Sequence, residues 1–363
     1  MPAVTATIPF DRVYSTTAAV ERPTVAMEIV QANPLLWHMY RQGAVAYEGG
    51  TECRVPVVLN ESSNVGAIGT YATFSTSPED GPDKARYPTW YKNRASMVID
   101  NTELAQNRGK YQIVNLLKAK QAIAKISLVN ELSRQMYQDN TARPLELNGL
   151  QSGFFEFAPE ANQNRTVGGI LKGPGAAGYA RWRNRYGVMT AFGTDGLDTW
   201  EEVYMDCSQR GTHPDIMLVD PIVYRFFKRL VAPNQEERDV ALWNQGFENL
   251  LFNGTPVVPD EELDNTGQTY FITTTGRRNV TDFNLKPEYF EVPGQNPLVQ
   301  AKATGIGMQL AILKDDDFRQ TAFLTPPNSD VILSHLYFTA MMTTSSEGRQ
   351  GCTNFTGGGA PVF

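Results

Sequence analysis

The 363-residue chain contains only three cysteines and three histidines. Because Cys53, Cys207 and Cys352 are odd in number and widely spaced, they predict neither a disulfide framework nor a zinc site, and they indicate folding inside the cell. The sequence also has no apolar run as long as a membrane-spanning helix, and no basic segment followed by an apolar one at its N-terminus. It therefore predicts a protein that is made in the cytoplasm and has no contact with a membrane.

Positive charge is scarce as well. Lysine and arginine total 32 against 39 aspartates and glutamates, which gives a formal net charge of -7. A nucleic-acid-binding surface over the whole protein is therefore not expected, and any such contact would be local. The hydrophobic fraction of 41% is typical of a folded globular protein, and the length predicts two or three domains or one extended domain.

The longest helical pattern in the chain runs from Asp100 to Asn140. It begins with a capping box, in which Asp100 is the cap and Glu103 stands at the third helical position. Apolar residues then recur with lysines and arginines between them, so one stripe of the helix is expected to be buried. At about 1.5 Å per residue this spine helix would be roughly 45–60 Å long. A coiled-coil helix is the alternative, but no strict heptad persists beyond about two turns. The predicted core residues of the spine helix are Leu116, Ile123, Ile126, Val129 and Leu132.

Two features are predicted before the spine helix. Residues 1–33 have no clear period and are expected to form an extended arm, followed by a short helix at 34–40 with Asn33 as its cap. A strand over 52–60 and a returning strand over 86–99 then enclose a turn-rich stretch. A long hairpin of this kind is only marginally stable alone, so we expect it to lie on a neighbouring subunit. Its predicted inter-subunit contacts are Thr73, Phe74, Tyr87, Trp90 and Tyr91.

After the spine helix the pattern changes to alternating helices and strands. Helices are predicted at 197–209 and 222–230, and an Asn253-Gly254 turn predicts a hairpin. The remaining strands are expected at 215–219, 269–273, 290–292, 298–313 and 330–343, before a loose glycine-rich end. Together with the spine helix they predict an α+β fold.

The residues that could carry chemistry are few. Cys207 and His213 could act as nucleophile and base, but a structural role is much more common for such a pair. The glycines at 305 and 307 lack the rest of a dinucleotide-binding fingerprint, and the three consecutive acids at 315–317 are more typical of a solvated turn than of a cation site. The sequence therefore predicts no cofactor and no metal.

Two further possibilities concern charged residues. A hydrolase could use carboxylates such as Asp195, Asp198 or Glu201, although no paired acid and base is evident. The cluster Arg181, Trp182 and Arg183 could stack on nucleic acid, but in an acidic chain a contact between subunits is the favoured interpretation.

The order of these parts resembles the major capsid proteins of tailed bacteriophages. The resemblance covers nearly the whole chain, and it depends on short motifs in the expected order rather than on any one of them. These are Asn33–Trp37, Gly49-Gly50, Trp90-Tyr91, Glu103-Leu104 with Asn107 and Gly109, Asn148–Gln151, Val167–Ile170, Trp182–Asn184, Pro214-Asp215 with Asp220 and Tyr224, Gly246–Leu250, and Phe252 to Asp260 with Gly254 and Pro256–Val258.

The resemblance implies the tailed-phage capsid fold and a division of the chain into five parts. They are an N-terminal arm at 1–49, an extended loop at 50–99, a peripheral domain with the spine helix at 100–190, an axial domain at 191–285, and strands at 286–363 that return to both domains. It further implies a structural protein, not an enzyme, which assembles as hexamers and pentamers into an icosahedral shell around double-stranded DNA.

The resemblance also implies partners. Some members of the family carry a long scaffolding segment at the N-terminus, and only about fifty residues precede the loop here, so a separate scaffolding protein and a portal are expected. A decoration protein is a further possibility, the DNA would be contacted non-specifically, and the protein would be part of the virion. The shell of an encapsulin-like nanocompartment is the alternative within this fold, and enzyme cargo in place of DNA would distinguish it.

Overall fold

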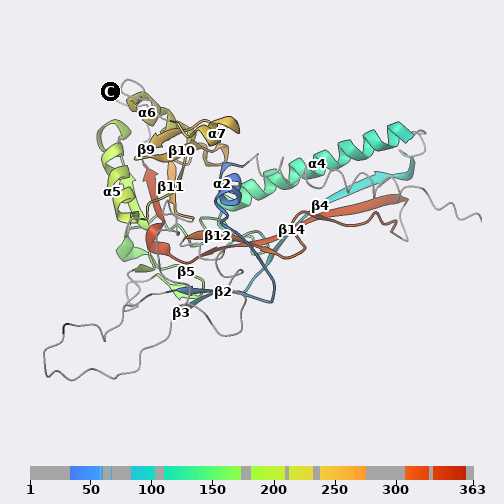
Figure 1. Ribbon diagram of the computed structural model, residues 1–363, viewed down its shortest axis with the longest axis horizontal. Helices are drawn as coiled ribbons and strands as arrows, with labels where there is room; N and C mark the ends of the chain where they lie inside the picture. The colour runs from blue at the N-terminus through green and yellow to red at the C-terminus, as the bar shows by residue number, and fades with distance from the viewer. Residues whose placement is uncertain are drawn as a thin grey trace, which may run out of the picture.

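The computed structural model describes residues 33–57, 59, 67, 83–102, 110–172, 181–208, 212–231, 238–274, 307–326 and 330–356; of Asp83 and of residues 110–119 it describes the backbone only. Within these ranges two sheets and a long helix organise the chain (Figure 1). The predicted strands at 290–292 and at 298–306, and the glycine-rich end, lie outside the described residues.

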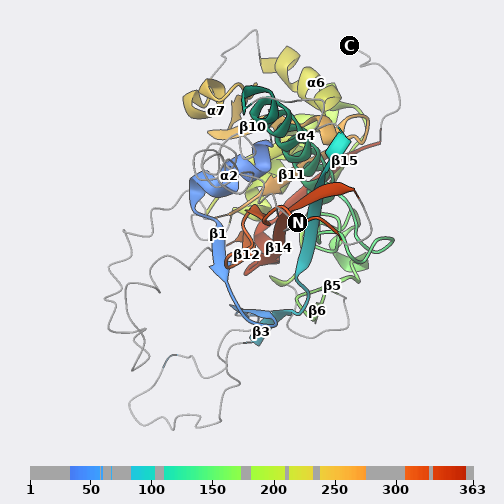
Figure 2. The same cartoon turned by 90° about the vertical axis from the view of Figure 1, so that its right-hand side faces the viewer.

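The first sheet has five strands. Its path is β1 (Val45–Glu48), β12 (Met308–Leu313), β14 (Val331–Thr344) and β13 (Arg319–Gln320), and β4 (Tyr91–Asp100) pairs with β14. The antiparallel ladder between β14 and β4 extends over ten residues, from Val331 opposite Asp100 to Ala340 opposite Tyr91. Figures 1 and 2 show these two strands side by side, projecting with the long helix away from the rest of the subunit.

The second sheet has six strands in the order β7 (Arg185–Met189), β15 (Gly351–Phe355), β11 (Gln268–Ile272), β8 (Ile216–Val219), β10 (Thr255–Pro259) and β9 (Leu250–Phe252). The central strand β8 is apolar on both faces, and all four of its residues are buried, as expected for a strand that is covered on both sides. The predicted turn forms between β9 and β10, where Asn253 and Gly254 both have positive φ. The strand β15 was not predicted.

Helices cover the second sheet. α5 (Leu197–Cys207) and α6 (Pro221–Val231) match the predicted helices to within about two residues, and they enclose an aromatic cluster around Trp200, Phe227 and Phe271. Figure 1 places both helices at the end of the subunit that is remote from the projecting strands. This cluster is separate from the larger core, which contains side chains of both sheets, such as Leu310 on β12 and Tyr270 on β11.

The spine helix is α4 (Lys110–Tyr137), which is 28 residues long. A helical turn does begin directly after Asp100, as predicted, since Asn101 and Thr102 are helical, but residues 103–109 lie outside the described residues and Asp100 also ends β4. Its side chain does accept a hydrogen bond from Thr102 N at 2.9 Å, as a cap would, while Glu103 lies outside the described residues. The shorter helix α2 (Pro34–Gln42) forms as predicted, with the Asn33 side chain accepting a hydrogen bond from Leu36 N and Pro34 in its first turn.

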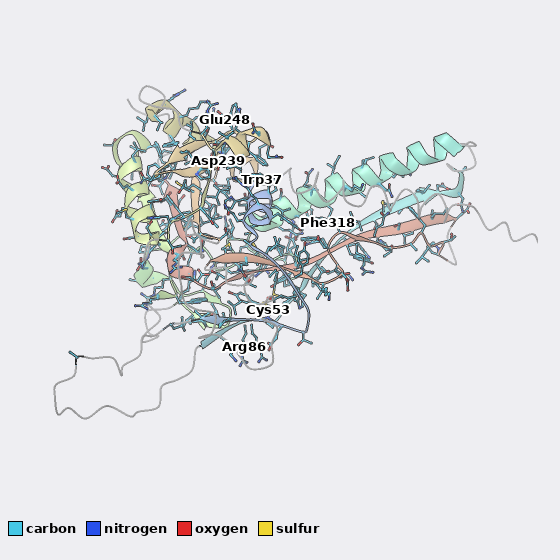
Figure 3. The ribbon with its side chains drawn as sticks, viewed as in Figure 1. Trp37, Cys53, Arg86, Asp239, Glu248 and Phe318 are labelled. Carbon is cyan, nitrogen blue, oxygen red and sulfur yellow. The ribbon has the colours of Figure 1, made fainter. Side chains whose placement is uncertain are left out.

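The predicted hairpin is shorter than expected. Its strands are β2 (Cys53–Val57) and β3 (Asp83–Tyr87), and residues 91–99, predicted as part of the returning strand, belong to β4 and pair with β14 instead. Arg86 on β3, labelled in Figure 3, donates its backbone N–H to Gly168 O at 2.7 Å, so the base of the hairpin is held by its own subunit.

The remaining described elements are short. They are β5 (Thr166–Val167), β6 (Ile170–Leu171) and α7 (Val240–Asn244), the 3-10 turns η1 (Glu160–Asn162), η4 (Glu261–Leu263) and η7 (Glu347–Arg349), and the π-helical turn η3 (Phe192–Gly196). No helix in the described part of the chain combines the length and the apolar composition that crossing a membrane requires.

Candidate functional site

Trp182 is not a contact between subunits, and this prediction is corrected. Its side chain is 1% exposed within the subunit, and its indole Nε1 donates to Val167 O at 3.3 Å. A large aromatic ring beside two arginines looks like a surface cluster in the sequence, but the ring lies in the core with Val167 of β5. Arg181 is exposed, and Arg183 is half-buried with its Nε donating to Lys172 O at 2.8 Å.

Tyr87 is also buried in its own subunit, which contradicts its assignment as an inter-subunit contact. Its hydroxyl donates to Thr344 O at 3.2 Å and accepts from Thr344 N at 3.1 Å, and its ring stacks on Phe154. Trp90 and Tyr91 are half-buried, and the Trp90 indole donates to Gly50 O at 3.0 Å. Thr73 and Phe74 lie outside the described residues.

The spine helix buries a different stripe from the one predicted. Val129 and Leu132 are in the core as expected, but Ile123 is 64% exposed and Ile126 is 60% exposed, so their assignment to the core is wrong. Leu116 lies where only the backbone is described. The buried positions at the middle of α4 are Gln121, Ala124 and Leu128, because the first sheet lies on that side. The buried stripe thus includes a polar residue, Gln121, and a small one, Ala124, neither of which an apolar period singles out.

The candidates for nucleophilic chemistry have structural roles. Burial raises the pKa of the Cys207 thiol well above its ordinary value, and a Cβ at Gly351 on β15 would come within 2.6 Å of the Cys207 sulfur. His213 instead pairs through Nδ1 with Ser208 Oγ at 2.8 Å, and its ring stacks on Tyr204. The structure therefore does not pair Cys207 with His213.

Among the carboxylates considered for hydrolysis or cation binding, Asp195, Asp316 and Asp317 form hydrogen bonds to the backbone or to neighbouring side chains. Asp195 accepts hydrogen bonds from Thr190 N, Thr190 Oγ1 and Ala191 N at 2.7–3.0 Å, which fixes the turn before α5. Asp198 and Glu201 are both exposed on α5. Asp316 pairs with Arg319 and Thr339, and Asp317 accepts from the hydroxyls of Tyr40 and Tyr47. Within the described ranges no three histidine, cysteine or acidic side chains gather as metal ligands would.

A buried ion pair was missed by the sequence analysis. Lys172 Nζ lies 2.8 Å from Glu347 Oε2, and both side chains have no solvent exposure. The ammonium group also donates to Phe154 O at 2.8 Å and to Asn184 Oδ1 at 3.0 Å, so all three of its protons have acceptors. Burial raises the pKa of Glu347, and Lys172 opposes that rise. The sequence could not predict this pair, because Lys172 and Glu347 are 175 positions apart and neither lies in a motif.

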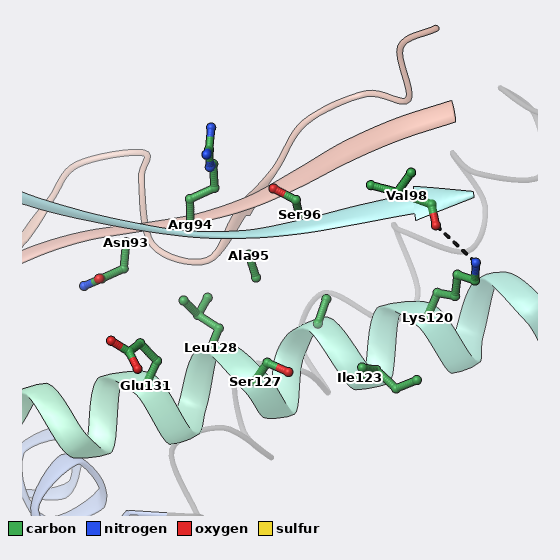
Figure 4. Close-up of a pocket in the computed structure, with 11 residues that line it drawn as sticks. Asn93, Arg94, Ala95, Ser96, Val98, Lys120, Ile123, Ser127, Leu128 and Glu131 are labelled. Carbon is green, nitrogen blue, oxygen red and sulfur yellow. Dashed lines mark hydrogen bonds between the residues drawn. The ribbon is translucent and has the colours of Figure 1, made fainter. Parts of the chain in front are cut away.

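A hollow in the described part of the subunit lies between α4 and β4 (Figure 4). We call it the α4–β4 groove, and its volume is about 510 Å³. Ala95 and Leu128 face each other across it, and Lys120 Nζ donates to Val98 O at 3.1 Å at one end. Its lining residues are Asn93, Arg94, Ala95, Ser96, Val98, Lys120, Ile123, Ala124, Ser127, Leu128 and Glu131. The lining combines apolar side chains such as Ile123 and Leu128 with the charged side chains of Arg94, Lys120 and Glu131.

Comparisons with known proteins agree with this architecture. No family model and no curated protein matches the chain. Among solved structures, the chain is similar to the capsid asymmetric unit of cyanophage A-1(L), with a TM-score of 0.58 and 14% sequence identity over 86% of this chain and 91% of that chain. The capsid of Myoviridae phage XM1 (TM-score 0.48, 11% identity, 87% and 91% covered) and an encapsulin complex from Synechococcus elongatus (TM-score 0.45, 11% identity, 85% and 84% covered) are more distant. The chain has the fold of tailed-phage capsid proteins.

Proposed function

We propose that the chain is the major capsid protein of a tailed bacteriophage. It assembles as hexamers and pentamers into an icosahedral shell around double-stranded DNA, and it is not an enzyme. The observation that carries the proposal is the similarity in fold to a phage capsid subunit over 86% of the chain. The proposal includes the predicted division of the chain into an arm, an extended loop, a peripheral domain and an axial domain.

The shape of the subunit supports assembly. The ladder of β4 and β14 and the helix α4 extend away from the compact part, and they expose apolar side chains at Val98, Ile123 and Ile126. A soluble monomer rarely exposes an extended edge strand and apolar residues together, because such surfaces pair with other chains. Neighbouring copies in a closed shell would cover them, and symmetry would multiply many modest contacts.

Among the residues predicted to contact neighbouring subunits, those that are half-buried or exposed in the single subunit would form the contacts between copies. Trp90, Tyr91, Arg181 and Arg183 keep part of their surface accessible in the subunit. Aromatic and arginine side chains of this kind are enriched at protein interfaces. Thr73 and Phe74, in the long connection between β2 and β3, remain proposed contacts of the extended loop.

The charge of the protein supports a shell that contacts DNA only non-specifically. With a net charge of -7, its surface would not adhere broadly to phosphates, which are spaced about one per 1.7 Å of duplex. A separate scaffolding protein, a portal and possible decoration proteins would complete the particle, and the protein would reside in the head of the virion.

Expression of the chain, alone and with a co-expressed scaffolding protein, tests the proposal by negative-stain imaging and sedimentation. We expect rings of five or six subunits or closed shells. A single monomeric species over a wide range of concentration, with and without scaffold, would refute the proposal. Nuclease-resistant DNA in shells purified from infected cells would support the phage function, whereas a folded enzyme inside the shells would identify a nanocompartment instead.

A further inference from the structure

The buried ion pair of Lys172 and Glu347 has a third member, the side-chain amide of Asn184. All three residues are fully buried. Lys172 Nζ lies 2.8 Å from Glu347 Oε2 and donates to Asn184 Oδ1 at 3.0 Å. A carbonyl bond is about 1.2 Å long, so the carbonyl carbon Cγ of Asn184 lies at most about 4.2 Å from Lys172 Nζ. An amine, a carboxyl group and an amide carbonyl thus meet away from water, and we call them the Lys–Glu–Asn cluster.

Hydrogen bonds to the backbone hold the Lys–Glu–Asn cluster together. Lys172 O accepts from Arg183 Nε at 2.8 Å, which fixes residue 172 beside the chain that leads into β7. The Asn184 amide pairs with the backbone of Glu156: Glu156 N donates to Asn184 Oδ1 at 3.1 Å, and Asn184 Nδ2 donates to Glu156 O at 3.0 Å. Groups that are held in contact in this way react far faster than the same groups free in solution, because the entropy of bringing them together is already lost on folding.

Burial eases proton transfer within the ion pair. It raises the pKa of Glu347, and among the described residues no hydrogen-bond donor reaches Glu347 Oε1. A desolvated carboxylate with so few donors accepts a proton more readily than an exposed one. Transfer of one proton from Lys172 Nζ to Glu347 leaves a neutral amine, which is the nucleophilic form of lysine.

The carbonyl group of Asn184 is placed to receive that amine. Its oxygen accepts hydrogen bonds from two donors, Glu156 N and Lys172 Nζ, and both polarise the C=O bond. As negative charge develops on Oδ1 during an attack at Cγ, the Glu156 N–H would remain in place to stabilise it, in the manner of an oxyanion hole. The cluster therefore holds a nucleophile, a proton carrier and an activated carbonyl.

We propose that Lys172 and Asn184 become joined by an isopeptide bond within one chain, with Glu347 as the proton carrier. Lys172 Nζ gives a proton to Glu347 and attacks Asn184 Cγ, which forms the new C–N bond. Glu347 passes its proton to Asn184 Nδ2 and takes one of the two protons left on Nζ. The Cγ–Nδ2 bond then breaks, ammonia leaves, and Glu347 keeps the remaining proton. No oxidant, cofactor or second chain takes part.

The ion pair and its contribution to stability belong to the subunit before this reaction. The inference does not depend on what the protein encloses or on whether it forms a shell, because all the reacting atoms lie in the core of one subunit.

The intact mass of the folded, full-length protein tests the proposal. After incubation and denaturation, we expect a mass lower than that of the sequence by one molecule of ammonia. Trypsin does not cleave after an acylated lysine, so a digest should contain the peptide 166–181 attached to the dipeptide 184–185. The full sequence mass together with free peptides ending at Lys172 would overturn the proposal.

Two other sites in the chain can lose ammonia and need a control. Asn148-Gly149 and Asn253-Gly254 are sequences in which the asparagine side chain can cyclise to an imide. Mild base opens an imide by adding water, whereas it leaves an amide bond intact. A mass deficit that persists after base treatment is therefore expected, and a deficit that base removes completely would overturn the proposal.

Three variants test the assigned roles. Glu347→Gln should have the full sequence mass, because the proton carrier is lost, whereas the matched control Glu160→Gln, at a carboxylate that pairs with Arg185, should keep the deficit. Asn184→Asp should form the same bond with loss of water instead of ammonia, and its digest should contain the same branched peptide. A deficit that survives Glu347→Gln would overturn the proposed mechanism. If Glu347→Gln does not fold, the masses of the unaltered protein and of Asn184→Asp decide the question.

Discussion

Tyr137, at the end of α4, donates a hydrogen bond from its hydroxyl to Asp260 Oδ2 at 2.6 Å, and both residues are buried. Asp260 follows β10 and caps the turn η4, so this one bond joins the spine helix to the six-stranded sheet. The rings of Tyr137 and Tyr270 also lie in contact, which extends the junction to β11. The long helix is therefore fixed at its base by a carboxylate of the other sheet.

The first prediction concerns the pH dependence of this junction. Burial raises the pKa of Asp260, and the hydrogen bond from Tyr137 opposes that rise. When folding raises the pKa of a carboxyl group, that group stabilises the folded protein at pH values below the ordinary carboxyl pKa. This stabilisation is lost as the pH rises through the pKa of the group in the folded state. Tyr137→Phe should therefore cost about 1.5–3 kcal/mol near neutral pH and less near the ordinary carboxyl pKa of about 4.

Urea unfolding of the unassembled subunit at the two pH values measures this difference. Tyr204→Phe is the control, because the Tyr204 hydroxyl bonds to a backbone oxygen, that of Asn253, at 3.4 Å. The effect of Tyr204→Phe on the free energy of unfolding should be small and independent of pH. An equal loss of stability at both pH values in Tyr137→Phe would contradict the assigned role of Asp260.

The second prediction concerns the buried ion pair. Lys172→Met should destabilise the subunit by about 3–5 kcal/mol, because it leaves the Glu347 carboxylate buried without its partner. The double variant Lys172→Met with Glu347→Gln should recover part of that loss, since no charge then remains in the core. Chemical unfolding of the three proteins tests this, and a double variant that is no more stable than Lys172→Met would show that the lost packing, not the unpaired charge, sets the cost.

The third prediction distinguishes the two faces of the spine helix. Ile126→Asp should change the free energy of unfolding by less than about 0.5 kcal/mol because the side chain is exposed, whereas Leu132→Asp should prevent soluble folding because it buries an unpaired charge. Circular dichroism and the soluble yield report both effects. Comparable damage from both substitutions would mean that Ile126 is covered within the isolated subunit.

The fourth prediction separates folding from assembly. Ala85 and Tyr87 are in the core, so a deletion of the hairpin must stop before β3. Replacing residues 62–81 with a short Gly-Ser turn should preserve the circular dichroism spectrum, because shortening a loop changes its closure entropy by only about 0.6 kcal/mol per halving. If the extended loop contacts a neighbouring subunit, the same protein should fail to form shells in negative-stain images. Normal shells would show that this loop is not needed for assembly.

The elements whose signal is local could be predicted from the sequence. Asn33 and Pro34 specify the start of α2, and Asn253-Gly254 specifies the turn between β9 and β10, because each depends only on the conformational preferences of a few neighbouring residues. The apolar run at Ile216–Val219 likewise identified a strand that is buried on both faces.

The features that depend on distant parts of the chain could not be predicted. Ile123 and Ile126 continue an apolar period, but whether a given face of α4 is buried depends on where β4 and β14 lie, which the helix sequence does not encode. Tyr87 was assigned to the surface because it stands in a hairpin, yet it bonds to Thr344, 257 residues away in sequence. Trp182 was assigned to the surface because it stands beside arginines, yet its indole bonds to Val167 on β5 and its ring is buried. The Lys172–Glu347 pair has no periodic signal at all.

The position of β15 constrains the order in which a newly made subunit can mature. β15 lies between β7 and β11, pairing in parallel with the first and antiparallel with the second. Until the ribosome has released Gly351–Phe355, a strand-wide gap separates β7 from the rest of that sheet, and Cys207 on α5 lacks the Gly351 backbone against which it packs. The six-stranded sheet of a nascent chain is therefore complete only after β15 has left the ribosome.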